Sequence, residues 1–168
     1  MRFLDHILPA AALGIALAVA GCKATTTATT NTVHTYSSNA AGIALAKRMN
    51  GLHERKHTRA IRAVVRTNPR RVPWCGYFNA AVARKQGLRP PKGYPRASSW
   101  TRWGKRVSKA NARPGDHIIR RGRGPSGYHT GVIVSVRKGV IRACSGNDSN
   151  RVRCRAWPRF THIRRGTR

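Results

Sequence analysis

The stretch PWCGYFNAAVARKQG, residues 73–87, decides the fold class of this chain, because it predicts a helix with a cysteine in its first turn. Pro73 lies at the start of the helix, where the backbone N–H that proline lacks would have no helical partner. Gly87 is a suitable C-terminal cap. The apolar residues between them recur at helical spacing: Trp74, Phe78, Ala81 and Val82. Unpaired N–H groups and the positive end of the helix dipole favour a thiolate at Cys75. The alternative is a structural cysteine, because free cysteines are among the most buried residues.

The rest of the chain separates into helices first and strands afterwards. Two helices are predicted ahead of the cysteine helix, over Ala41 to Met49 and about Glu54 to Val65, and a short one starts at Ser98. Beyond the turn Arg113-Pro114-Gly115-Asp116 the pattern changes to period two. The predicted strands cover residues 117–119, 129–136, 140–144, 152–156 and 160–163. Helices followed by antiparallel strands predict an α+β domain in which the N-terminal helices pack on the sheet.

Two polar residues in the strand region complement the thiol. His129 starts the most hydrophobic strand and is framed by Gly127 and Gly131, which permit close approach of backbone or substrate. Asn147 follows the next strand and is suited to accept the other ring N–H of the histidine. A thiol, an imidazole and an amide are the nucleophile, base and orienting group of a cysteine peptidase. The predicted catalytic residues are Cys75, His129 and Asn147.

The N-terminal residues indicate export. Arg2 supplies a positive charge, and residues 7–20 are nearly all apolar but too short for a comfortable membrane span. The segment ends in Leu17-Ala18-Val19-Ala20-Gly21-Cys22, which is similar to a bacterial lipoprotein signal with Cys22 as the lipidated first mature residue. The alternative is an ordinary signal peptide with an incidental cysteine. We expect residues 1–21 to be a signal peptide, residues 22–40 a flexible Thr/Ser-rich tether, and residues 41–168 the folded domain.

Export makes unpaired thiols a liability unless they do chemistry. Cys144 ends one predicted strand and Cys154 lies in the next, so a disulfide between them would clamp the loop that carries Asn147. Such a bridge contributes about 2–3 kcal/mol in the chain-entropy model. This pairing leaves Cys75 free. A pairing through Cys75 is the open alternative, and it would remove the nucleophile.

Basic residues greatly outnumber acidic residues in this chain. It holds 34 Lys and Arg residues against 4 Asp and Glu, a formal net charge of +30. This balance predicts an anionic partner, and for an exported protein the anionic envelope polymers and lipid surfaces come first. The basic residues are spread along the whole domain, which disfavours specific nucleic-acid recognition.

A rival motif lies in the second predicted helix. His53-Glu54-Arg55-Lys56-His57 has the H-E-x-x-H pattern of zinc metallopeptidases, with two histidines one turn apart and a glutamate base. The context disfavours zinc, since Asn50-Gly51 breaks the helix just before the motif and many neighbouring residues are basic. A solvated charged helix is the favoured interpretation, and we expect no metal or other cofactor.

Several short motifs together resemble the CHAP/NlpC-type cysteine peptidases, which are papain-like amidohydrolases of peptidoglycan. The resemblance covers about residues 43 to 165 and is carried by Pro73-Trp74-Cys75, Ser99-Trp100, Trp103-Gly104, Arg113-Pro114-Gly115-Asp116, the His129 strand and Ser145-Gly146-Asn147. It implies a papain-like fold, with Cys75 as nucleophile, His129 as base and Asn147 as the orienting residue.

The chain departs from this family at a few positions. Tyr128 stands where the family commonly has a glycine before the histidine, which would narrow access to the site. His117 lies where the strand is usually apolar and is a rival base, and Asp148 is the alternative to Asn147.

These observations lead to one functional hypothesis and two alternatives. The hypothesis is an exported hydrolase of peptidoglycan amide bonds in the bacterial cell envelope, anchored to a membrane through Cys22. The first alternative is an inactive cationic module that binds cell wall or lipopolysaccharide, and the second is the zinc peptidase.

Overall fold

The computed structural model describes residues 39–167. The predicted signal peptide, the lipidation site Cys22 and nearly all of the predicted tether lie outside these residues. Residues 39 and 40 belong to the first described helix, which therefore includes two residues assigned to the tether. Within the described part of the chain, no helix is both long enough and apolar enough to cross a membrane.

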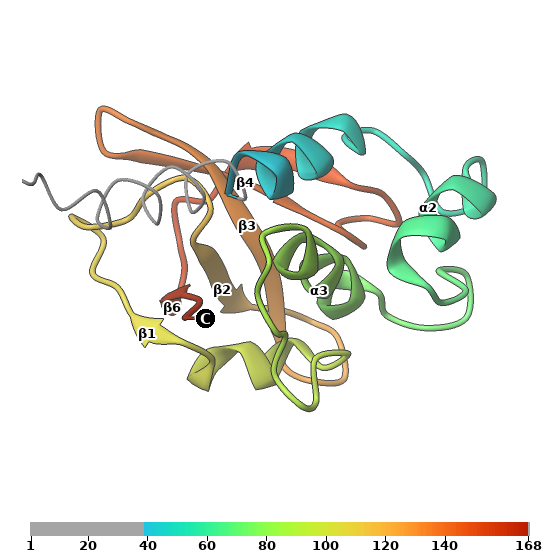
Figure 1. Cartoon of the computed structure of the whole chain (residues 1–168). Helices are drawn as coiled ribbons and strands as arrows, with labels where there is room; N and C mark the ends of the chain where they lie inside the picture. Colours follow the sequence, from blue (N-terminus) through green and yellow to red (C-terminus); the bar gives the residue numbers. More distant parts are fainter. Residues whose placement is uncertain (1–38, 168) are drawn as a thin grey trace, which may run out of the picture.

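The helices precede the strands along the chain, as predicted (Figure 1). A helix over residues 39–48 is followed by α2 (Thr58–Val65), α3 (Cys75–Lys85) and the 3-10 helix η1 (Ala97–Arg102). The strands are β1 (Lys105–Arg106), β2 (His117–Arg121), β3 (Tyr128–Arg137), β4 (Val140–Ser145), β5 (Arg153–Ala156) and β6 (His162–Arg165). The prediction that a helix starts at Cys75 is confirmed.

The six strands form one antiparallel sheet in the order β1-β6-β2-β3-β4-β5. The α+β prediction is therefore confirmed. The pair of β1 with β6 was not predicted, because the two residues of β1, Lys105 and Arg106, carry no apolar alternation. The long central strands β2 and β3 lie beside each other, and Arg120 of β2 is directly opposite His129 of β3.

The helices bury one face of the sheet. Trp74, Phe78 and Val82 of the α3 region pack on Val132 and Val134 of β3, and Leu45, Met49, Ile61 and Val65 from the two earlier helices complete this core. Figure 1 shows α3 lying in front of the β2–β3 part of the sheet. The other face is covered by loops rather than helices, and its core contains Ile118, Ile133, Ile141, Trp157 and Ile163. Burial on both faces fixes the register of β3, which carries His129.

The second helix is shorter than predicted. We expected it to begin at about Glu54, whereas α2 begins at Thr58. Residues 53–57 form a turn ahead of the helix, in which His57 Nδ1 accepts the backbone N–H of His53 at 3.0 Å. The backbone N–H of Glu54 donates to the carbonyl of Asn150 at 2.8 Å, which ties the turn to the segment before β5.

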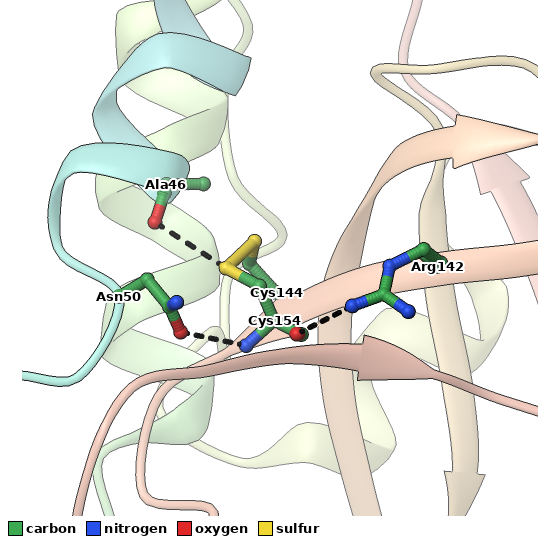
Figure 2. The surroundings of a disulfide bond; sticks show 5 residues. All are labelled: Ala46, Asn50, Arg142, Cys144 and Cys154. Atoms are coloured by element: carbon green, nitrogen blue, oxygen red, sulfur yellow. Dashed lines mark hydrogen bonds between the residues drawn. A yellow bond between two sulfur atoms is a disulfide. The ribbon is translucent and has the colours of Figure 1, made fainter.

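A disulfide joins Cys144 of β4 to Cys154 of β5, the pairing that the cysteine spacing favoured. The two residues are direct cross-strand partners. Figure 2 shows the bridge beside the first helix, where Asn50 Oδ1 accepts the Cys154 backbone N–H at 2.9 Å. Arg142 donates to the Cys154 carbonyl at 3.3 Å. The bridge thus lies where the edge of the sheet meets the end of the helix over residues 39–48.

Reduction of this disulfide should lower the free energy of unfolding by about 2–3 kcal/mol, because the closed loop restricts the unfolded chain. Urea denaturation with and without dithiothreitol measures the change. The Cys75→Ala variant, in which the bridge is intact, is the control and should respond to the reductant as the wild type does. An unchanged midpoint on reduction would contradict the prediction.

Candidate active site

Cys75 is the first residue of α3 and is buried, with 7% of its surface exposed. The preceding Trp74 is fully buried, and its indole Nε1 donates to Glu54 Oε2 at 3.1 Å. The following Gly76 permits a close backbone contact, since a Cβ atom there would lie 2.3 Å from the carbonyl oxygens of Tyr94 and Pro95. Trp74 and Gly76, the two neighbours of Cys75, therefore pack the start of α3 tightly against the rest of the protein.

A buried hydrogen bond ties the cysteine helix to the histidine strand. Asn79 lies one turn after Cys75, and its Nδ2 donates to Thr130 Oγ1 at 2.9 Å. Thr130 is the residue after His129, so the bond joins the two elements next to both predicted catalytic residues. Sequence reasoning missed Asn79, although a fully buried amide within an apolar helix is a signal of such a contact.

The ring of His129 is fixed by Ser145, the last residue of β4. Ser145 Oγ lies 2.6 Å from His129 Nε2, and also 2.7 Å from the carbonyl oxygen of Thr130. A hydroxyl has one proton, and a carbonyl oxygen can only accept. The serine proton therefore belongs to the Thr130 carbonyl, and Ser145 Oγ accepts a hydrogen bond from Nε2–H of the ring. This network assigns the tautomer in which Nδ1 is unprotonated and able to act as a base.

Asn147 does not make the contact that the sequence predicted for it. It lies in the turn after β4 with a φ of 57° and lines the same cleft as Cys75 and His129, but the orienting hydrogen bond at Nε2 comes from Ser145. The alternative, Asp148, is held by Arg155 in a bidentate ion pair, with distances of 2.8 and 3.0 Å. The physical reason is position: the end of β4 runs beside the strand that carries His129, whereas the turn with Asn147 lies beyond it.

Trp157, in the loop after β5, was also missed by the sequence analysis. Its ring stacks on the imidazole of His129, with the ring centroids 5.8 Å apart and the planes at 19°. The guanidinium of Arg120 lies over the same indole at 5.1 Å from the ring centroid. The histidine is thus held in place by a hydrogen bond at Nε2 and by an aromatic face.

Cys75 and His129 line one open cleft of about 850 Å³. Its walls come from the start of α3, the loop around Pro95, the β2–β3 connection and the turn after β4. Tyr128 is part of the wall and packs beside Arg121, whose guanidinium lies 4.7 Å from the centre of its ring. The tyrosine that we expected to narrow access therefore lies along the wall of a cleft that also reaches Cys75.

The electrostatics of the site favour a neutral pair at rest. Burial raises the pKa of the Cys75 thiol, and hydrogen bonding from the backbone of Thr130 and the charge of Arg120 offset only part of this rise. Burial, together with the charge of Arg120, lowers the pKa of His129 to about 4. The thiolate that the helix position suggested is therefore disfavoured at rest, because desolvation by burial is the largest influence on the pKa of both Cys75 and His129.

The rival sites lie elsewhere. His117 is fully buried against Trp100 and Trp103, with its Nε2 2.8 Å from Gln86 Oε1, and burial lowers its pKa to about 3. It does not line the cleft, so it cannot serve Cys75 as a base. Among residues 39–167 no three His, Cys, Asp or Glu side chains are grouped as metal ligands. Glu54 is used by the Trp74 indole, which leaves the H-E-x-x-H residues in a structural turn.

Replacing Gly146 by alanine should cost about 1–3 kcal/mol of stability through overpacking. A Cβ atom at this position would lie 2.6 Å from Phe78 Cβ and 2.6 Å from Trp74 Cζ3. Thermal or urea unfolding measures the loss. Gly124→Ala is the matched control, since a Cβ atom there meets nothing within 4 Å, and it should be near neutral. Equal effects of the two variants would refute the close packing at Gly146.

The pH profile of Cys75 alkylation should report the raised thiol pKa. The reactive species is the thiolate, so the rate should keep increasing above pH 8, with its midpoint higher in folded protein than in urea-unfolded protein. Iodoacetamide labelling followed by mass spectrometry gives both profiles. A folded-state rate that is already constant between pH 5 and 8 would indicate a thiolate–imidazolium pair and contradict the prediction.

No protein-family model matches this chain, and no curated protein matches it either.

Proposed function

We propose that this chain is an exported, papain-like cysteine hydrolase that cleaves amide bonds of peptidoglycan. The observation that carries the proposal is the pairing of a free thiol at a helix start with a histidine in the base tautomer, in one open cleft. The order of elements, with the thiol on a helix and the histidine on the antiparallel sheet that follows, supports the papain-like assignment. The substrate class rests on the resemblance to CHAP/NlpC-type peptidases and on the export signal.

The proposed mechanism starts from neutral partners. His129 Nδ1 accepts the proton of the Cys75 thiol as the sulfur attacks the carbonyl carbon of the amide, and the imidazolium then protonates the leaving amine. A water molecule, deprotonated by the same Nδ1, attacks the resulting thioester and releases the carboxylic acid and the thiol. The backbone N–H of Cys75, in the first turn of α3, is a donor for the developing oxyanion. Ser145 acts as a positioning residue that keeps the proton on Nε2.

The location in the cell envelope is part of the proposal. Residues 1–21 as a lipoprotein-type signal and Cys22 as the lipid attachment site would hold the domain at a membrane surface. The disulfide between Cys144 and Cys154 supports an oxidising compartment. The net charge of +30 favours contact with anionic envelope polymers around the substrate.

Digestion of purified peptidoglycan tests the activity. Cys75→Ala should abolish release of amino groups, because no other group in the cleft is placed to replace the thiol. Ser145→Ala should lower kcat by roughly tenfold or more, since the ring loses its orienting partner, while Asn147→Ala should have a small effect. Full activity in Cys75→Ala would refute the thiol mechanism. A larger loss in Asn147→Ala than in Ser145→Ala would return the orienting role to Asn147.

A second candidate is a cationic wall-binding module without turnover. The observation that favours it is the burial of both Cys75 and His129, which keeps the thiol protonated. Absence of digestion by any form of the protein, together with co-sedimentation of wild type and Cys75→Ala with peptidoglycan, would select this module over the hydrolase.

A further inference from the structure

The cleft beside Cys75 is strongly and asymmetrically charged. Among the described residues that line it, one is acidic, Asp148, and the basic side chains are all arginines: Arg96, Arg120, Arg121, Arg123 and Arg155. Five positive charges and one negative charge leave a net charge of +4 around a volume of about 850 Å³. Arg155 is already used, because it pairs with Asp148 in a bidentate contact. Arg120 reaches the same Asp148 carboxylate only at 4.0 Å, and no ion pair forms at Arg96, Arg121 or Arg123 within residues 39–167.

Arg120 differs from the other three by its position. It is directly opposite His129 across the β2–β3 pair, and its charge acts on both Cys75 and His129. The side chain is only 31% exposed and is held over the Trp157 ring. Exposed arginines on a rim are mobile, whereas this one is aimed by its packing.

The guanidinium of Arg120 has unused hydrogen-bonding capacity. Its Nη1 has one weak contact with the Arg121 carbonyl at 3.4 Å, and its Nη2 lies 4.0 Å from Asp148 Oδ1. A guanidinium has five N–H donors in a planar fork that matches a carboxylate. Among the described residues only Asp148 offers this partly buried fork a carboxylate, at the limit of ion-pair distance and already held by Arg155, so most of the Arg120 N–H donors lack a partner.

We propose that Arg120 binds a free carboxylate of the substrate next to the scissile amide, so that the enzyme selects acidic peptides over their amidated counterparts. This inference rests on the proposed hydrolase function. The anion belongs to the peptide rather than to a phosphate polymer, because a group that lies beside the thiol must be carried by the molecule whose amide is cut. Charge-assisted, bidentate hydrogen bonds of this kind are worth about 10- to 100-fold in affinity.

The test is a pair of peptides from peptidoglycan that differ in one group, a glutamate carboxylate or its primary amide. Their dissociation constants are measured by calorimetry at 150 mM salt on the Cys75→Ala protein, which binds without cleaving. The acidic peptide should bind about 10- to 100-fold more tightly than the amide. Arg120→Gln should reduce this ratio to near one, and Arg120→Lys should leave an intermediate ratio, because the charge remains but the fork is lost.

Arg137→Gln is the matched control, since it removes one positive charge from an exposed position outside the cleft and should leave the ratio unchanged. Equal losses in Arg137→Gln and Arg120→Gln would mean general attraction to a basic protein and would overturn the proposal. So would inorganic phosphate that competes for Arg120 more strongly than the acidic peptide does. Because binding is measured without turnover, a protein that never cleaves peptidoglycan but keeps the Arg120-dependent ratio would refute the hydrolase and leave the carboxylate site standing.

Discussion

The close approach between the start of α3 and the ends of β3 and β4 is the constraint on which the rest of the site depends. Gly146 has no room for a Cβ atom because Trp74 and Phe78 lie against its backbone. The buried bond between Asn79 and Thr130 holds the same two layers together one helical turn away. With the helix and the sheet at this separation, the thiol and the imidazole line one cleft, and the buried Ser145 contacts the imidazole from behind it. If α3 and the sheet were further apart, the same residues would be present in the chain but would not lie close to one another.

The chemistry at the site is governed by desolvation more than by the helix dipole. A thiol at a helix start, near an arginine, is usually expected to ionise. Here the burial of Cys75 opposes both effects, and the burial of His129 keeps its ring neutral. In the proposed mechanism the proton therefore moves as the sulfur attacks. Ser145 is important to this mechanism because a neutral ring can carry its proton on either nitrogen, and only one of the two tautomers serves the thiol.

The sequence predicted the framework better than the contacts. Periodicity located α3 and five of the six strands because apolar residues recur at the spacing that each element requires. It placed the start of α2 too early, since residues 53–57 are tied by the Glu54 N–H to the carbonyl of Asn150, a contact between distant parts of the sequence that periodicity does not show. Ser145 was missed because a serine between a disulfide cysteine and a glycine has no periodic signature. Gly131 was the available signal: a Cβ atom there would lie 2.6 Å from the Cys144 carbonyl oxygen and 3.2 Å from Ser145 Cβ, so this glycine permits the close approach of the end of β4.

Two tightly packed glycines, Gly76 within α3 and Gly146 against it, have an evolutionary meaning beyond stability. Gly76 and Gly146 are fixed by backbone and core atoms, whereas Cys75 would be required only for the proposed chemistry. If that chemistry were lost in a lineage, the cysteine would be free to drift while both glycines stayed under selection for the fold. A descendant with this combination would keep a cleft lined with arginines and could bind anionic ligands without cleaving them.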